Sequence, residues 1–159
     1  MIILALDAAK TTGYAFKGTE GWQWGTVDGY NSARRTDLIK WAVEQGCTHV
    51  ALEQPYLGLN AKSYGDLMEV RGMLRADATR EGLMYVENDL RPSTWQRHQL
   101  VIGGRPCPKG MTKTWSREVA GRIVGYTFKT KEHDAADAVC IADYVTQISR
   151  LEGLLEVGK

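Results

Sequence analysis

The chain has 159 residues, 43% of them apolar, which suits a single domain over residues 1–159 with a substantial core. No apolar run is long enough to span a membrane, and the N-terminal Met-Ile-Ile-Leu-Ala-Leu-Asp lacks the basic start of a secretory signal, so a strand is expected there. The widely spaced Cys47, Cys107 and Cys140 favour a reducing compartment and no zinc site. The net charge is only +1, although its distribution along the chain is uneven.

The first part of the chain predicts an antiparallel meander followed by a helix. Gly-containing turns, Thr12-Gly13 and Lys17-Gly18, separate three strand-like runs at 2–7, 13–17 and 22–27. Asn31 or Ser32 can cap a helix that ends near Gly46. Three tryptophans are expected to pack in the core or between helices and sheet, with the first two on one strand face: Trp22, Trp24 and Trp41.

Strands and helices alternate in the rest of the chain. A strand at 49–53 precedes a helix at about 61–81, which Gly82 ends, and a fifth strand follows at 83–87. The long helix carries an apolar stripe at helical spacing: Leu67, Val70, Leu74 and Ala78. Pro92 can open a short helix, residues 102–110 are expected to form a loop, and helices at about 113–124 and 133–151 complete the chain.

Four carboxylates are placed where separate elements would bring them to one edge of the sheet. Asp7 and Glu53 end apolar strand-like runs, and Asp134 and Asp137 share one face of a helix that is otherwise apolar. Asp7 could be a turn former and Asp134 could simply favour a helix N-terminus. Converging acids repel one another unless a cation lies between them, and Mg²⁺ prefers such oxygen ligands. A metal-dependent nuclease is therefore the leading hypothesis.

Positive charge is concentrated in one segment. Residues 91–131 hold nine Lys and Arg against the single Glu118, while residues 1–90 and 132–159 balance at −3 and −4. A solvated basic face is one explanation. The interleaving of these cations with Trp95 and Trp115 instead favours a surface for a phosphate backbone with base contacts nearby.

These motifs resemble the RuvC family of Holliday-junction resolvases over nearly the whole chain. The resemblance is carried by Asp7 with Thr12-Gly13-Tyr14, by Glu53-Gln54 followed by Tyr56, Asn60, Ser63 and Arg71-Gly72, and by Asp134-Ala-Ala-Asp137. It implies an α/β ribonuclease H-like fold, in which a five-stranded mixed sheet of three antiparallel strands and then parallel strands is flanked by helices. It also implies that the protein is a crossover junction endodeoxyribonuclease. Such an enzyme would work in the cytoplasm of a bacterium or of a phage-infected host and would not associate with a membrane.

The resemblance assigns roles to individual residues. Asp7, Glu53, Asp134 and Asp137 would bind two Mg²⁺ or Mn²⁺ ions and cut DNA to leave 5′ phosphates. Lys113, in preference to Lys109, would assist at the scissile phosphate. The exposed aromatic after the catalytic Glu, Tyr56, would stack on a base in the opening of a four-way junction, although an aromatic here could equally be packed. The helix starting near residue 61 would form a homodimer. The remaining DNA contacts are expected from Asn60, Ser63, Arg71, Arg105, Lys109, Lys113 and Arg117, with Lys10 a further neighbour of phosphate.

Departures from the family pattern and rival functions define the alternatives. The family has Asp-Pro-Gly after the first strand, where this chain has Asp7-Ala8-Ala9-Lys10, and Tyr56 replaces the usual Phe. Such drift is typical of a divergent, phage-type member and leaves junction specificity open. An RNase H or a general flap and branch nuclease is the alternative enzyme, and a non-catalytic DNA-binding scaffold is the alternative without catalysis. An actin-like or sugar-kinase ATPase would need two such domains.

Overall fold

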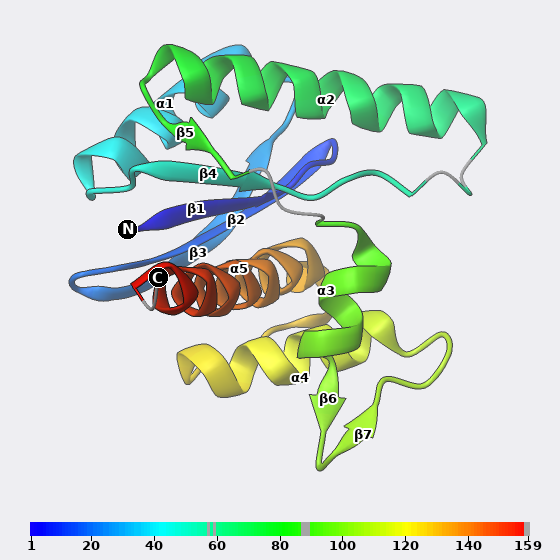
Figure 1. Cartoon of the computed structure of the whole chain (residues 1–159). Coiled ribbons are helices and arrows are strands. Elements are labelled where there is room, and N and C mark those ends of the chain that lie inside the picture. The colour runs from blue at the N-terminus through cyan, green and yellow to red at the C-terminus, as the bar shows by residue number, and fades with distance from the viewer. Residues whose placement is uncertain (57, 59, 87–89, 158–159) are drawn as a thin grey trace.

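A five-stranded mixed sheet forms the centre of the computed structural model, which describes residues 1–157 apart from 57, 59 and 87–89 (Figure 1). The strands are β1 (Ile3–Asp7), β2 (Thr11–Gly18), β3 (Gly21–Asp28), β4 (His49–Leu52) and β5 (Met84–Tyr85), in the order β3-β2-β1-β4-β5. β1, β2 and β3 pair antiparallel, whereas β4 is parallel to β1 and β5 is parallel to β4. The predicted ribonuclease H-like sheet is confirmed.

Helices cover both faces of this sheet. Helices α1 (Ser32–Glu44) and α2 (Ala61–Arg80) lie on one face, and α5 (His133–Val157) lies on the other, where α4 (Thr112–Val124) and α3 (Pro92–Gln99) pack against it (Figure 1). Side chains of β1 point alternately to the two faces of the sheet and so belong to two hydrophobic clusters. Leu4 and Leu6 pack with α1 and α2, while Ile3 and Ala5 pack with α5. Among the described residues no helix is long and apolar enough to cross a membrane.

The apolar stripe of α2 belongs to the core. Val70, Leu74 and Ala78 are buried and pack in the cluster that lies between α1, α2 and the sheet, and Leu67 is half-buried. Asn60 caps the helix by accepting a hydrogen bond from Ser63 N over 2.9 Å. Because this stripe packs within the chain, it is not the part of the helix that could form the expected homodimer.

The segment predicted as a loop at 102–110 contains a short hairpin instead. Strands β6 (Val101–Ile102) and β7 (Arg105–Pro106) pair antiparallel across Gly103 and Gly104. Both glycines have positive φ, 57° and 75°, as a type I′ turn requires, and Pro106 fits an edge strand because it needs no partner for an N–H. The sequence interpretation gave too much weight to the Gly and Pro residues as loop formers. A 3₁₀ turn, η1 (Thr130–Glu132), leads into α5.

Candidate active site

Asp7 and Glu53 lie side by side because they end adjacent parallel strands. Asp7 is the last residue of β1, Glu53 follows β4, and the Glu53 amide continues the ladder by donating to Leu6 O over 3.1 Å. The two side chains share a hydrogen bond.

Gly13 lets α5 bring its acids to the same edge. Gly13 is paired with Asp7 across β1 and β2, and a Cβ atom at Gly13 would lie 1.9 Å from the backbone oxygen of Asp134. The first turn of α5 therefore rests directly on the strand, at a distance only glycine permits. Asp134 and Asp137, three residues apart, consequently face the end of β1.

The four acids are close enough to alter one another's ionisation. Burial raises the pKa of Asp7 well above its ordinary value, and the neighbouring Glu53 and Asp134 raise it further. Burial likewise raises the pKa of Glu53 to about 7, with Asp137 adding to the effect. The pKa of Asp137 is also about 7, first because of burial and then because of Asp7 and Asp134. The predicted convergence of the four carboxylates is thus present in the structure.

Glu53 and Asp137 are held by three side chains, of which the sequence had marked Trp95 and Arg71 only for contact with DNA and Ser116 not at all. Trp95 donates from Nε1 to Glu53 Oε1 over 2.6 Å, and Arg71 donates from Nε to the backbone oxygen of Glu53 over 3.2 Å. The hydroxyl of the buried Ser116 donates to Asp137 Oδ1. Trp95 is only 1% exposed, so its expected contact with DNA bases was wrong. Arg71, which the sequence placed near DNA phosphates, also donates to the Tyr85 hydroxyl. This second bond holds the guanidinium group in place against the Glu53 backbone.

Lys113 faces the acid cluster from α4. Its ammonium group lowers the pKa of both Asp7 and Asp137. The His133 imidazole connects the lysine to the helix start, because Nε2 lies 3.1 Å from Lys113 Nζ and 3.1 Å from Asp134 Oδ1. His133 Nδ1 lies 3.3 Å from Thr130 O, which orients the ring. Of the two lysines considered from the sequence, Lys113 is therefore the one whose charge acts on the acids.

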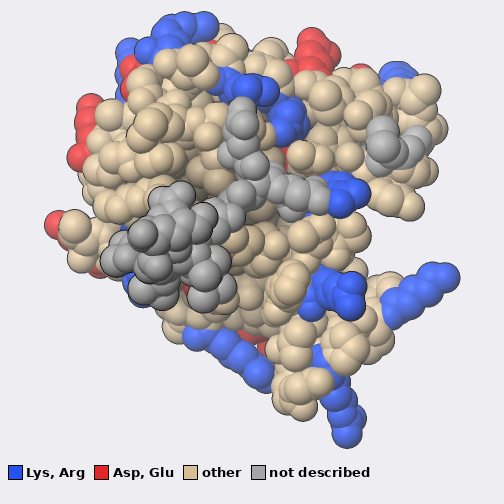
Figure 2. Space-filling view, viewed as in Figure 1, with Lys and Arg blue, Asp and Glu red and all other residues tan. Residues whose placement is uncertain are grey.

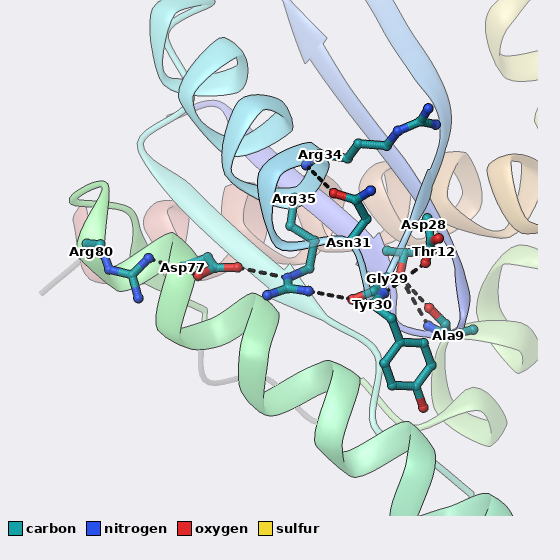
Figure 3. A network of polar contacts seen from close by, with 10 residues as sticks. All are labelled: Ala9, Thr12, Asp28, Gly29, Tyr30, Asn31, Arg34, Arg35, Asp77 and Arg80. Carbon is teal, nitrogen blue, oxygen red and sulfur yellow. Dashed lines mark hydrogen bonds and ion pairs between the residues drawn. The ribbon is translucent and has the colours of Figure 1, made fainter.

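A buried polar network fixes the loop that follows Asp7 (Figure 3). The Thr12 hydroxyl donates to Ala9 O over 2.6 Å, and Gly29 N donates to Lys10 O over 2.7 Å. Arg35, 4% exposed, donates to Gly29 O and forms a 2.8 Å ion pair with Asp77 of α2. The tighter turn that replaces Asp-Pro-Gly is thus held by contacts from α1 and α2, with the Lys10 side chain exposed.

The remaining residues expected at DNA are distributed around this edge. Tyr56 is 64% exposed, and Arg105 and Lys109 are exposed on and after the β6–β7 hairpin. Figure 2 shows Lys and Arg projecting at the lower right, where Figure 1 places that hairpin, and also across the top, where some Asp and Glu lie as well. Arg117 is half-buried and bonds Lys113 O and the Thr130 hydroxyl, so it also ties α4 to the turn before α5.

Each acid in this arrangement is engaged by a protein group. Within residues 1–157, leaving out the five that are not described, no three His, Cys, Asp or Glu side chains are set in a geometry that would hold a metal ion. Asp7 and Glu53 bond each other, Asp137 accepts from Ser116, and Asp134 contacts His133. The set of donors is nevertheless the hard, anionic oxygen set that divalent cations prefer.

Comparison with known proteins supports the fold at the level of three-dimensional structure. No protein-family model matches the chain, and no curated protein matches it by sequence. Thermus thermophilus RuvC in complex with a Holliday junction substrate is similar, with a TM-score of 0.69, 14% identity, and coverage of 95% of this chain and 96% of that one. A further Thermus thermophilus RuvC structure gives a TM-score of 0.66 at 14% identity, covering 96% and 97%. The chain therefore has the fold of the RuvC Holliday-junction resolvases.

Proposed function

We propose that this protein is a structure-selective DNA endonuclease that resolves Holliday junctions or other branched DNA. It hydrolyses phosphodiester bonds with divalent metal ions and leaves 5′ phosphates. The observation that carries the proposal is the convergence of Asp7, Glu53, Asp134 and Asp137 at one sheet edge, in a fold similar to that of a RuvC solved with its junction substrate.

The chemistry of the acid cluster fits two Mg²⁺ or Mn²⁺ ions. Carboxyl groups whose pKa is raised to about 7, first by burial and then by neighbouring acids, bind protons more tightly than exposed isolated acids do, and a divalent cation can replace those protons. Asp7, Glu53, Asp134 and Asp137 are the residues that would hold the ions. Bound metal would supply Lewis-acid stabilisation of the attacking and leaving oxygens.

The chain's own residues contribute orientation and charge. Trp95 and Arg71 fix Glu53 from two sides, and Ser116 fixes one oxygen of Asp137, so the carboxylates lose little freedom on binding. Lys113 places a positive charge beside the acids, where the scissile phosphate would enter. Arg105 and Lys109 extend the positive surface along the path of a DNA arm.

A homodimer would suit a four-way junction, because two-fold symmetry presents two active sites to symmetry-related strands. The face of α2 opposite its buried stripe carries small exposed residues: Gly65, Gly72 and Ala76. A Cβ atom at either glycine would meet no atom within 4 Å, so a second helix could approach closely. We propose this outer face as the dimer contact. A monomeric mass by light scattering at assay concentration, with paired cutting retained, would contradict it.

One panel of substrates tests the function and its alternatives. Labelled four-way junction, flap, duplex and RNA–DNA hybrid are incubated with the protein in Mg²⁺, in Mn²⁺ and in EDTA. We expect metal-dependent cutting of the junction with 5′-phosphate products. Preference for the hybrid would indicate an RNase H. Equal cutting of flaps and junctions would indicate a general branch nuclease, and DNA binding without any cutting would indicate a non-catalytic scaffold.

A further inference from the structure

A pocket of about 390 Å³ lies beside the acid cluster and is not used by the proposed chemistry. It is formed where the segment after β4 meets the first half of α2 and the start of α3. The walls include Gln54, Tyr56, Tyr64, Met68, Arg71 and Pro92. We propose that this pocket receives one unpaired nucleobase from the strand that is cut, an inference that rests on the proposed function.

The chemistry of the walls matches a nucleobase. Two tyrosine rings, a thioether and a proline ring give flat or deformable apolar surfaces, against which the faces of any base can stack. The Gln54 amide offers both a donor and an acceptor for the polar edge of a base. A guanidinium group adds a planar cation that also stacks on bases.

Arg71 links this pocket to the catalytic carboxylate. Its Nε donates to Glu53 O over 3.2 Å, and the Tyr85 hydroxyl bonds its Nη2, so the guanidinium plane is fixed in the pocket wall. Gln54, another wall residue, directly follows Glu53 in the chain. This position beside Glu53 is the reason we assign the base to the strand that is cut.

The position of the pocket selects against paired DNA. A base that is stacked and paired inside a duplex must first leave the helix to reach the pocket, whereas a base at a branch point is unpaired at low cost. Tyr56 stands at the pocket as the exposed aromatic. Tyr56 would stack on a base at the branch point, and the pocket would bind the displaced base. Both contacts would favour a junction whose bases are unpaired at the branch point.

The test compares binding to junctions that carry a single abasic site, moved one nucleotide at a time through the branch point. Affinity is measured by fluorescence anisotropy in EDTA, so that no cleavage is required. At one position the wild-type protein should lose about tenfold or more in affinity, the contribution of stacking one base. Tyr64→Leu keeps apolar volume but removes the ring. Its affinity for the intact junction should be lower than that of the wild type by the same factor. On the junction that is abasic at the sensitive position, the variant and the wild type should bind equally.

Two matched variants complete the design. Tyr64→Phe keeps the ring and should behave as wild type, and Met84→Ala, an exposed methionine on β5 away from the pocket, should leave the abasic effect unchanged. Equal affinity of the wild type for intact and abasic junctions at every position would overturn the inference. So would equal losses by Tyr64→Leu on both substrates. Absence of metal-dependent cutting would instead refute the nuclease proposal, and the binding comparison would still decide the pocket.

Discussion

The indole N–H of Trp95 donates to Glu53 Oε1 over 2.6 Å, although 42 residues separate the two in the chain. This bond favours the charged form of Glu53 and holds the pKa of the carboxyl group lower than burial alone would place it. A tryptophan in the core beside α5 would thus help to set the pH above which the proposed site binds a cation.

Trp95→Phe should move the pH dependence of cleavage. Removal of the donor raises the pKa of Glu53, so the pH of half-maximal activity should rise by about one unit, the equivalent of a hydrogen bond to a charged group. Single-turnover rates measured from pH 5.5 to 9.5 check this. Because Phe keeps most of the buried ring, the rate at high pH should stay within a few fold of wild type, and an unmoved profile would refute the role given to Trp95.

Changing any of Asp7, Glu53, Asp134 or Asp137 to the amide should lower junction cleavage by about 100-fold or more, because a ligand for the metal is lost. Binding of the junction should be unchanged or tighter, since less negative charge then faces the DNA. Gel-based cleavage and anisotropy measure the two effects. Asp143→Asn is the control on the same helix, because Asp143 bonds Gln99 and Gln147 outside the cluster. Near-normal cutting by Glu53→Gln or Asp137→Asn would contradict the proposal that these acids are metal ligands of the active site.

Without metal, the acid cluster should make the fold less stable as pH rises. The pKa of Asp137 is about 7 in the folded chain and near 4 when unfolded, so its contribution to stability is present at low pH and lost as pH rises through 7. That loss is up to roughly 3 kcal/mol, or several degrees in Tm. Thermal melts in EDTA from pH 5 to 9 should show it, and Mn²⁺ at pH 8.5 should reverse it. Asp137→Asn should flatten the profile and weaken the effect of Mn²⁺.

Gly13→Ala should separate α5 from β2. The added Cβ would lie 1.9 Å from Asp134 O, so the first turn of the helix must move and carry Asp134 and Asp137 away from Asp7. We expect a lower Tm, loss of cleavage and a smaller stabilisation by Mn²⁺. Gly18→Ala, on the same strand, is the matched control because its Cβ would meet nothing closer than 3.6 Å. Wild-type activity in Gly13→Ala would show that the contact does not position the acids.

Tyr56→Ala should cut an intact junction one or two orders of magnitude more slowly, since stacking of a base contributes roughly 1–3 kcal/mol. A junction already unpaired at the cleavage site should restore its rate, and Tyr56→Phe should be close to normal because the ring does the stacking. Cleavage rates on the two substrates decide between roles. Equal loss on both, or a lowered Tm, would make Tyr56 a structural residue.

Local patterns predicted the sheet and the convergence of the acids because both follow from strand order. Asp7 and Glu53 end apolar runs, and parallel strands bring their carboxyl ends to one edge. The partners of those acids were missed because nothing in the spacing along the chain connects them: Ser116 lies 21 residues from Asp137, and Trp95 appeared in a basic segment. Helix packing alone decides which side chains of α3 and α4 turn inward.

The apolar stripe of α2 illustrates a second limit. Helical periodicity identifies a face that is buried, but burial against the sheet and burial against another subunit give the same pattern. Val70 and Leu74 proved to face the sheet. The side of α2 proposed for a partner is instead marked by small residues such as Gly65 and Gly72, which a hydrophobicity pattern does not single out.

The placement of the acids also determines when during synthesis the protein could become active. Asp7 is made 127 residues before Asp134, and the contact between Gly13 and α5 joins the two parts of the chain. While α5 is still inside the ribosome, the chain can present Asp7 and Glu53, but Asp134 and Asp137 cannot yet lie beside them. Chains terminated before α5 would therefore lack two of the four acids on which the proposed activity depends.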